Sequence, residues 1–293
     1  ALFALDLAGL NGSPPSNHQG GGAKETTMFN WPLFLVLVLA CVPGVLVTIP
    51  NAIQVTVAAA GSLPAGRTLP SRRTILVASL VQTMLLVVLA AAAGTALAPR
   101  VGLAAPFFEA LVSGGLVWDA FVSQAFPALP LGVGGALILV AAYYLHFRPR
   151  LDERTLRHME GLRMSLGVWA RLLYGGIVEE VMFRWGVMTL LVWIGSLLFG
   201  SPTPAVVWTV IVISGVLFGL GHVPSYRAAG CQVTPMFLAT AIVLNLWATL
   251  LCGWLFWQYG LLAAMLAHML YHLVWLPFDL HFAGRLLSQE SQP

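Results

Sequence analysis

The chain has 293 residues, of which 59% are hydrophobic and 9% are charged, and its mean hydropathy is +0.87. Soluble domains carry about 25% charged residues. The composition therefore excludes a water-soluble globular protein and predicts a protein embedded in lipid. Because helices satisfy their own backbone hydrogen bonds in a bilayer, we expect an all-α, polytopic transmembrane helical bundle. The formal net charge of +3 is too small to indicate nucleic-acid binding.

A polar segment precedes the first apolar runs. Residues 1–27 contain Gly, Ser, Pro and Asn and lack the basic start of a signal peptide, so we expect a disordered tail or leader. Two apolar runs come next, at about 31–48 and 75–97, each close to the roughly 20 residues that cross a bilayer as a helix. Residues 101–129 are apolar but interrupted by Pro, Gly, Glu and Asp. A pair of re-entrant or interfacial helices and one more broken span both fit this segment.

Five further apolar runs predict the remaining spans, at about 131–147, 173–198, 204–222, 235–257 and 261–280. The chain is therefore expected to cross the membrane seven or eight times. Arginines concentrate in alternate connections, above all between residues 148 and 163. The positive-inside rule makes that face cytoplasmic, which predicts a multi-pass protein of the cell (inner) membrane.

A few ionisable residues lie inside these predicted spans, where they are costly and indicate function. They are Glu179, Glu180 and Arg184 in the fourth span, His222 at the end of the fifth, and His268 and His272 in the seventh, with Asp279 near the end of that span. The four-residue spacing puts Glu180 and Arg184 on one helical face, where they can form an ion pair. Glu179 points in another direction and is not used by that pair. A Glu–Arg pair can also simply clamp two helices, and a single histidine can simply pack. Asn245 could line a site or bond a neighbouring helix.

A carboxylate beside a histidine in a protected cavity can deprotonate water for attack on an amide carbonyl. Further imidazoles can donate hydrogen bonds to the developing oxyanion. Ser214 and Cys252 lack a comparable setting, and we expect the three cysteines to be small buried hydrophobes. One Glu with three His could equally bind zinc, although the chain has no H-E-x-x-H motif.

These residues form three motifs in order: Glu179-Glu180-x-x-x-Arg184, Phe218-x-x-x-His222 and His268-x-x-x-His272. Over roughly residues 165–280 the series resembles the CPBP family of CAAX-protease and bacteriocin-processing intramembrane proteases, including the Rce1-type glutamic endopeptidases. The resemblance implies that Glu179 and His222 activate the hydrolytic water and that His268 and His272 stabilise the oxyanion. It implies that Arg184 holds the site through Glu180, and that the mechanism needs no metal or other cofactor.

The resemblance also divides the chain into 28–150, N-terminal transmembrane helices, and 151–293, a catalytic core. His272 stands where the Rce1-type pattern has asparagine, which puts CAAX-type specificity in doubt. The arginine-rich, lysine-poor composition is typical of a GC-rich bacterium, so the expected substrate is a peptide or a membrane-anchored protein rather than a prenylated one. The alternative hypothesis is a non-catalytic immunity or scaffold protein of the same fold.

Overall fold

The computed structural model describes residues 28–60 and 71–288, with side chains at 28–50 and 71–286. The tail at 1–27, for which a leader is expected, lies outside the described residues. Within them every regular element is a helix, and seven segments are long and apolar enough to cross a membrane: 31–50, 72–101, 117–150, 167–199, 204–228, 235–259 and 261–286. The predicted all-α, polytopic bundle is confirmed.

The N-terminal elements comprise α1 (Trp31–Ala60), α2 (Arg72–Leu97), η2 (Ala98–Val101), α3 (Pro106–Ser113), α4 (Val117–Ala141), η3 (Ala142–Phe147) and η4 (Arg148–Arg150). The fourth span is preceded by α5 (Glu153–Ser165) and built from α6 (Gly167–Ala170), η5 (Arg171–Val178), η6 (Val181–Met188) and α7 (Thr189–Phe199). The chain continues with α8 (Pro204–Ala228), α9 (Pro235–Tyr259), α10 (Leu261–Phe278), η7 (Asp279–Ala283) and α11 (Gly284–Ser288).

The ambiguous segment 101–129 resolves into a short helix and the first half of a span. Helix α3 ends at Ser113, Gly114 with φ +72° is its C-cap, and α4 starts at Val117. The third span therefore starts about four turns before the predicted residue 131, because Pro127 and Pro130 lie inside α4 and do not end it. Proline is tolerated in membrane helices where neighbours satisfy the freed backbone groups. Over the described part of the chain the count is seven spans, without an eighth.

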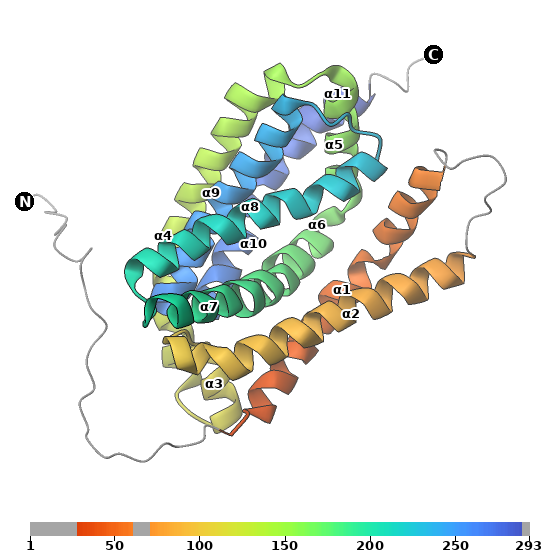
Figure 1. Cartoon of the computed structure of the whole chain (residues 1–293). Helices are drawn as coiled ribbons and strands as arrows, with labels where there is room; N and C mark the ends of the chain where they lie inside the picture. The colour runs from red at the N-terminus through yellow and green to blue at the C-terminus, as the bar shows by residue number, and fades with distance from the viewer. Residues whose placement is uncertain (1–27, 61–70, 289–293) are drawn as a thin grey trace, which may run out of the picture.

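Two groups of helices pack side by side (Figure 1). The α1–α2 hairpin lies along the helix formed by α6, η5, η6 and α7, while α4, α8, α9 and α10 form the rest of the bundle. Small residues permit the closest approaches. A Cβ at Gly132 of α4 would lie 2.9 Å from Cα of Ala267 in α10, so glycine allows these two helices to touch.

The start of α10 is fixed by α4. Gly260, with φ +108°, turns the chain from α9 into α10. The side chain of Gln124 in α4 then accepts a hydrogen bond at Oε1 from the backbone N–H of Leu262, at 3.2 Å. This contact satisfies one of the free N–H groups at the helix start and sets the position of the two histidines further along α10.

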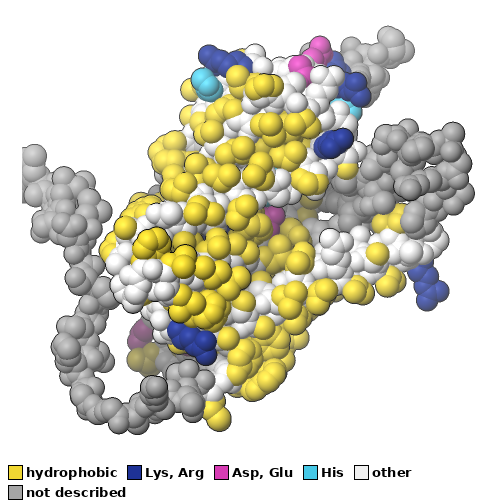
Figure 2. Space-filling view, in the orientation of Figure 1, with side chains coloured by type: hydrophobic (Ala, Val, Ile, Leu, Met, Phe, Trp, Pro, Cys, Tyr) yellow, Lys and Arg dark blue, Asp and Glu magenta, His cyan; other side chains and the backbone are white. Residues whose placement is uncertain are grey.

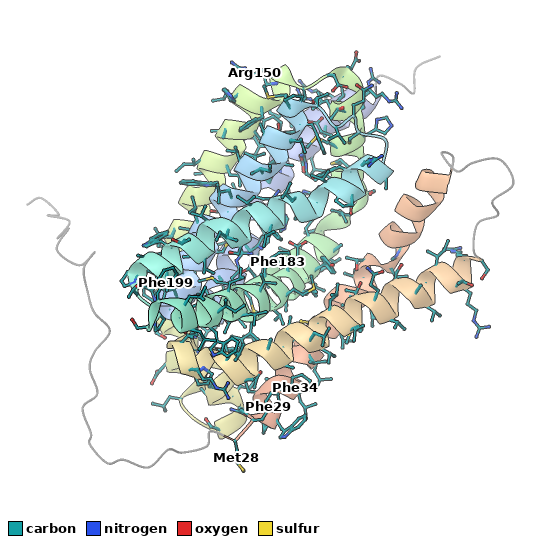
Figure 3. The ribbon with its side chains drawn as sticks, viewed as in Figure 1. Met28, Phe29, Phe34, Arg150, Phe183 and Phe199 are labelled. Atoms are coloured by element: carbon teal, nitrogen blue, oxygen red, sulfur yellow. The ribbon has the colours of Figure 1, made fainter. Side chains whose placement is uncertain are left out.

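The surface agrees with a multi-pass membrane protein. Apolar side chains cover the middle of the face in Figure 2, and charged groups concentrate towards the ends of the bundle. Arg150 lies at one such end (Figure 3). Leu137, Leu198 and Phe199 are among the large apolar side chains that are half or more exposed, as expected where lipid replaces water.

Candidate active site

The helix that carries the two glutamates is wound unusually on both sides of them. Residues 171–178 and 181–188 form π-helices, with Glu179 and Glu180 between them. The backbone N–H of Glu179 bonds to the carbonyl of Tyr174, five residues earlier. Such stretches are rare and occur often at functional sites, and here they set the direction of both carboxylates.

Two glycines bring α10 against this helix. A Cβ at Gly175 would overlap the ring of His272, and a Cβ at Gly176 would overlap the side chain of Met269. The Gly175-Gly176 pair therefore lets the face of α10 that carries the histidines lie directly on η5.

Glu180 binds two partners. Its Oε2 lies 3.1 Å from Nε of Arg184, as the four-residue spacing predicts, and its Oε1 lies 2.6 Å from Nδ1 of His268. Arg184 also donates a hydrogen bond from Nη2 to Oγ1 of Thr249 on α9, at 3.2 Å. Glu180 and Arg184 are almost completely buried. This chain of contacts ties the fourth, sixth and seventh spans together.

Glu179 lies between two histidines from different spans. Its Oε1 is 3.9 Å from Nε2 of His222, and its Oε2 is 3.9 Å from Nε2 of His268. The exposed fraction is 16% for the Glu179 side chain and 31% for that of His222. Both distances exceed a direct hydrogen bond. Among the described residues they leave Glu179 without a close basic partner, as the sequence predicts.

Hydrogen bonds on the far side of each ring determine which nitrogen faces Glu179. Nδ1 of His222 lies 2.8 Å from the carbonyl oxygen of Phe218, so the neutral ring carries its proton there and presents a bare Nε2. The Nδ1 contact of His268 with Glu180 has the same consequence. In their neutral forms both histidines present a lone pair towards the Glu179 carboxylate.

His272 joins the group through His268 and not through Glu179. The two rings stack with centroids 5.0 Å apart and an interplanar angle of 21°. Nε2 of His272 is buried and has no hydrogen-bond partner in the described part of the chain. Phe218 packs edge-on against His222 at 4.7 Å and lies 5.2 Å from the guanidinium of Arg184. It is the apolar support of the cluster.

A cavity of about 570 Å³ contains this cluster. Glu179, His222, His268 and His272 line it, and Asn245 does so too while bonding its own helix at the carbonyl of Ala241. Part of the wall comes from the N-terminal helices, through Thr48, Ser79, Gln82 and Thr83. No sequence pattern identifies these four residues, since isolated polar residues in a span look the same whether they line a cavity or only pack between helices. Phe183, labelled in Figure 3, lies one turn after Glu179 and packs on Phe218 at 4.7 Å.

A second polar cluster borders the same cavity. Arg163 and Arg171 both bind Asp279, at 2.8 and 2.9 Å, and Arg148 binds Glu160 at 2.8 Å. The sequence indicates only a topological role for Arg148 and Arg163. The structure shows them in buried or half-buried ion pairs, which no local motif reveals because the partners lie 12 and 116 residues away along the chain.

Side chains that could support other chemistries are placed less favourably. Cys41, Cys231 and Cys252 are free and buried, as predicted, and burial raises the pKa of the Cys231 thiol, which lies between two spans, to about 12. Ser214 is buried and donates to the carbonyl of Ile211. Among the residues that the structure describes, no group of three or more His, Cys, Asp or Glu side chains is arranged to hold a metal ion.

The seven spans and the buried Glu–His–Arg cluster define the class: a polytopic membrane protein with a polar site inside its spans. Residues 161–274 match the family model described as type II CAAX prenyl endopeptidase Rce1-like. Over this segment the chain matches the Rce1-like CAAX-protease family, which confirms the resemblance, and the family implies protease activity. No curated protein and no solved structure matches the chain.

Proposed function

We propose that this protein is an intramembrane endopeptidase that hydrolyses a peptide bond of a membrane-anchored protein or peptide with water activated by Glu179 and His222. The observation that carries the proposal is the position of Glu179, 3.9 Å from His222 and 3.9 Å from His268 at the wall of a cavity inside the spans. A carboxylate with nearby imidazoles suits general-base hydrolysis.

The two 3.9 Å gaps suit a bridging water. A polar contact longer than about 3.5 Å commonly contains one. Because Glu179 and the neutral His222 both present acceptors to the gap, a water between them donates one hydrogen to each. Its oxygen lone pairs then face the cavity, where a peptide carbonyl would lie.

The bond changes result from that placement. Glu179 takes a proton from the water as the water oxygen attacks the carbonyl carbon, and the carbonyl electron pair moves onto its oxygen. The tetrahedral intermediate collapses, the C–N bond breaks, and the departing amine takes the proton held by Glu179. The two products are a new carboxyl terminus and a new amino terminus, and Glu179 is again a carboxylate.

His268 and His272 are the proposed donors to the oxyanion. His268 donates from Nε2 when it is an imidazolium, with Glu180 as counter-charge at 2.6 Å. Nε2 of His272 has no partner among the described residues, and a neutral imidazole protonated there donates one hydrogen bond.

The proposal places the site towards the cytoplasmic side of the inner membrane. Arg148, Arg150, Arg154 and Arg157 are crowded at or just after the end of the third span, and such clusters face the cytoplasm. Substrate would reach the cavity from that side or from the bilayer, with no requirement for a nucleic acid or cofactor.

The decisive experiment compares membrane-protein termini in cells that carry the wild-type protein, Glu179→Gln or His222→Ala. New termini that appear only with the wild type, and cleavage of the same substrate by the purified protein, support the proposal. If both variants cleave as the wild type does, the water-activating roles are wrong. If no condition yields cleavage and the cellular phenotype is the same in all three strains, the non-catalytic immunity or scaffold hypothesis replaces it.

A further inference from the structure

Three polar side chains of α2 line the cavity. They are Ser79, Gln82 and Thr83, and they lie outside residues 161–274, the segment that matches the family. Ser79 follows Arg72, the first residue of α2, by seven positions, which is about 10 Å along a helix. The most apolar window of this span has a mean hydropathy of 2.5. Polar side chains at such a depth are costly and indicate a functional role.

The hydrogen-bonding groups of these three side chains are unused. None of them forms a hydrogen bond with another residue that the structure describes. Serine and threonine in helices can bond a carbonyl three or four residues earlier, and Thr48 of α1, on the same wall, does so with Val45 at 2.9 Å. Ser79 and Thr83 instead keep their hydroxyls free. With the amide of Gln82 they offer both donors and acceptors to the cavity.

The spacing of the three side chains suits an extended peptide. Positions 79, 82 and 83 share one face of the helix, and the rise between Ser79 and Thr83 is about 6 Å. Along one edge of an extended chain, peptide groups that point the same way recur every two residues, which is about 6.6 Å. The two hydroxyls therefore match two such peptide groups, with Gln82 between them.

The same helix is anchored to the fourth span further along. A Cβ at Gly186 of η6 would overlap Ala90, and a Cβ at Gly94 would overlap Trp185, so the second half of α2 packs tightly on η6. The first half of α2 instead contributes to the wall of the cavity in which Glu179 lies. A rigid contact therefore holds the polar face of α2 in a fixed position relative to the catalytic helix.

We propose that Ser79, Gln82 and Thr83 bind the main chain of an unwound substrate segment and hold it in the cavity that contains Glu179. The proposal rests on the endopeptidase function and adds how the substrate is held. A segment in lipid is helical because its N–H and C=O groups have no other partners there. Unwinding for cleavage exposes these groups, and the polar face of α2 supplies new partners. Contacts of this kind do not depend on the side chains of the substrate.

Backbone esters test the contact without requiring cleavage. The probe is a fluorescein-labelled apolar hexapeptide, Ser-Ala-Val-Leu-Ala-Ala, which is too short for a stable helix. In each of three analogues an ester replaces one central amide and so removes a single N–H. Affinities are measured by fluorescence anisotropy with the full chain in detergent, in a Glu179→Gln background. We expect at least one ester to bind about twofold to tenfold more weakly than the amide peptide, which is the effect of one hydrogen bond.

Two variants of α2 should remove this ester penalty. Gln82→Met keeps the length of the side chain without its amide, and Ser79→Ala with Thr83→Val removes both hydroxyls with little change in volume. Thr209→Val is the matched control, because Thr209 is an exposed residue of α8 that does not line the cavity. We expect the penalty to shrink in the two α2 variants and to persist in the control. Either α2 variant is sufficient if the other does not fold.

Three results would overturn the proposal. The first is equal binding of the amide and all three ester peptides, and the second is a penalty that is unchanged in both α2 variants. The third is no binding of the amide peptide, since main-chain contacts should accept any apolar sequence.

These outcomes are independent of the proposed function. If the wild type cleaves nothing while the penalty depends on α2, the endopeptidase assignment fails and the main-chain contact remains. If cleavage depends on Glu179 while the penalty is the same in every variant, the function stands and α2 has no such role.

Discussion

The carboxylate of Glu180 lies 2.6 Å from Nδ1 of His268, and its other oxygen lies 3.1 Å from Arg184. One buried side chain thus holds a histidine of the seventh span and an arginine of its own span. Glu179, the adjacent residue, has no such close contact with a basic group among the described residues. The two consecutive glutamates therefore have different roles, and substitutions at each should separate stability from activity.

Glu180→Ala should destabilise the fold strongly. The change leaves the buried guanidinium of Arg184 without its counter-charge, and breaking a buried pair typically costs about 3–5 kcal/mol. Thermal unfolding in detergent measures the effect. Glu179→Gln is the matched control, since Glu179 is partly exposed to the cavity and makes no contact below 3.9 Å to a basic group of the described chain. Similar melting temperatures for the two variants would contradict this division of roles.

Gly175→Ala should disturb the histidine pair of α10. Its methyl group would overlap His272, so the ring must move or the helices must separate, and overpacking of this kind costs about 1–3 kcal/mol. We expect a lower melting temperature and a lower kcat with the substrate found by terminal proteomics. Gly134→Ala is the control because a Cβ there meets nothing within 4 Å. A Gly175→Ala protein as stable and active as that control would show that the contact is unimportant.

His272→Asn should retain most activity, whereas His272→Ala should lose about tenfold to a thousandfold in kcat. The asparagine amide can donate the hydrogen bond that the oxyanion role requires, while alanine cannot. Initial rates at saturating substrate, with the proteins normalised by folded fraction, distinguish the two variants. Equal activity in both would remove His272 from the proposed oxyanion site.

Helix α5, which carries Glu160, should depend on its N-cap in a manner that varies with pH. The Asp152 side chain accepts a hydrogen bond from the backbone N–H of Thr155 at 2.8 Å, and this bond lowers the pKa of Asp152 below its ordinary value of 3.8. A lowered pKa means that the stabilisation is complete above about pH 4 to 5 and is lost as the pH falls through the folded-state pKa.

Asp152→Ala should therefore lower stability by about 1 kcal/mol at neutral pH, and the difference from wild type should shrink in acid. Melting temperatures at several pH values measure it. Asp152→Asn keeps a capping oxygen without the charge and should be intermediate at neutral pH. A difference between wild type and Asp152→Ala that grows on acidification would contradict the assignment.

Removal of metal should not affect cleavage. The mechanism proposed for Glu179 and His222 uses only the side chains and water, whereas the zinc alternative requires a bound ion. Elemental analysis of the purified protein, followed by an assay after dialysis against a chelator, tests this expectation. Activity that is lost with the chelator and restored by zinc would favour the metal-dependent mechanism.

The sequence predicts the parts of this fold that depend on local patterns. The lengths of the apolar runs predict the seven spans, and the four-residue spacing of Glu180 and Arg184 predicts their ion pair. Each of these features depends on residues within a single helix. The convergence of Glu179, His222 and His268 also agrees with the three motifs, although their distances come only from the structure.

Features that depend on contacts between distant segments do not show in the sequence. In the sequence Thr249 looks like an ordinary helical residue, and only the structure shows that its hydroxyl accepts a hydrogen bond from Arg184. Asp279 appears only as the end of a span, but it binds two arginines more than 100 residues earlier. The prolines of α4 predict a break that tertiary packing overrides, so the length of the third span is underestimated.

The π-helical winding around Glu179 and Glu180 makes the fourth span sensitive to its own length. Each π stretch accommodates its residues with wider turns than an α-helix. Deleting one residue within 171–178 while the winding stays the same would rotate the cytoplasmic part of the helix by up to about 100° relative to the part beyond the deletion. Arg171 and Glu179 would then face different directions, although every side chain of the motifs was retained. For this span, insertions and deletions should be less tolerated than most substitutions.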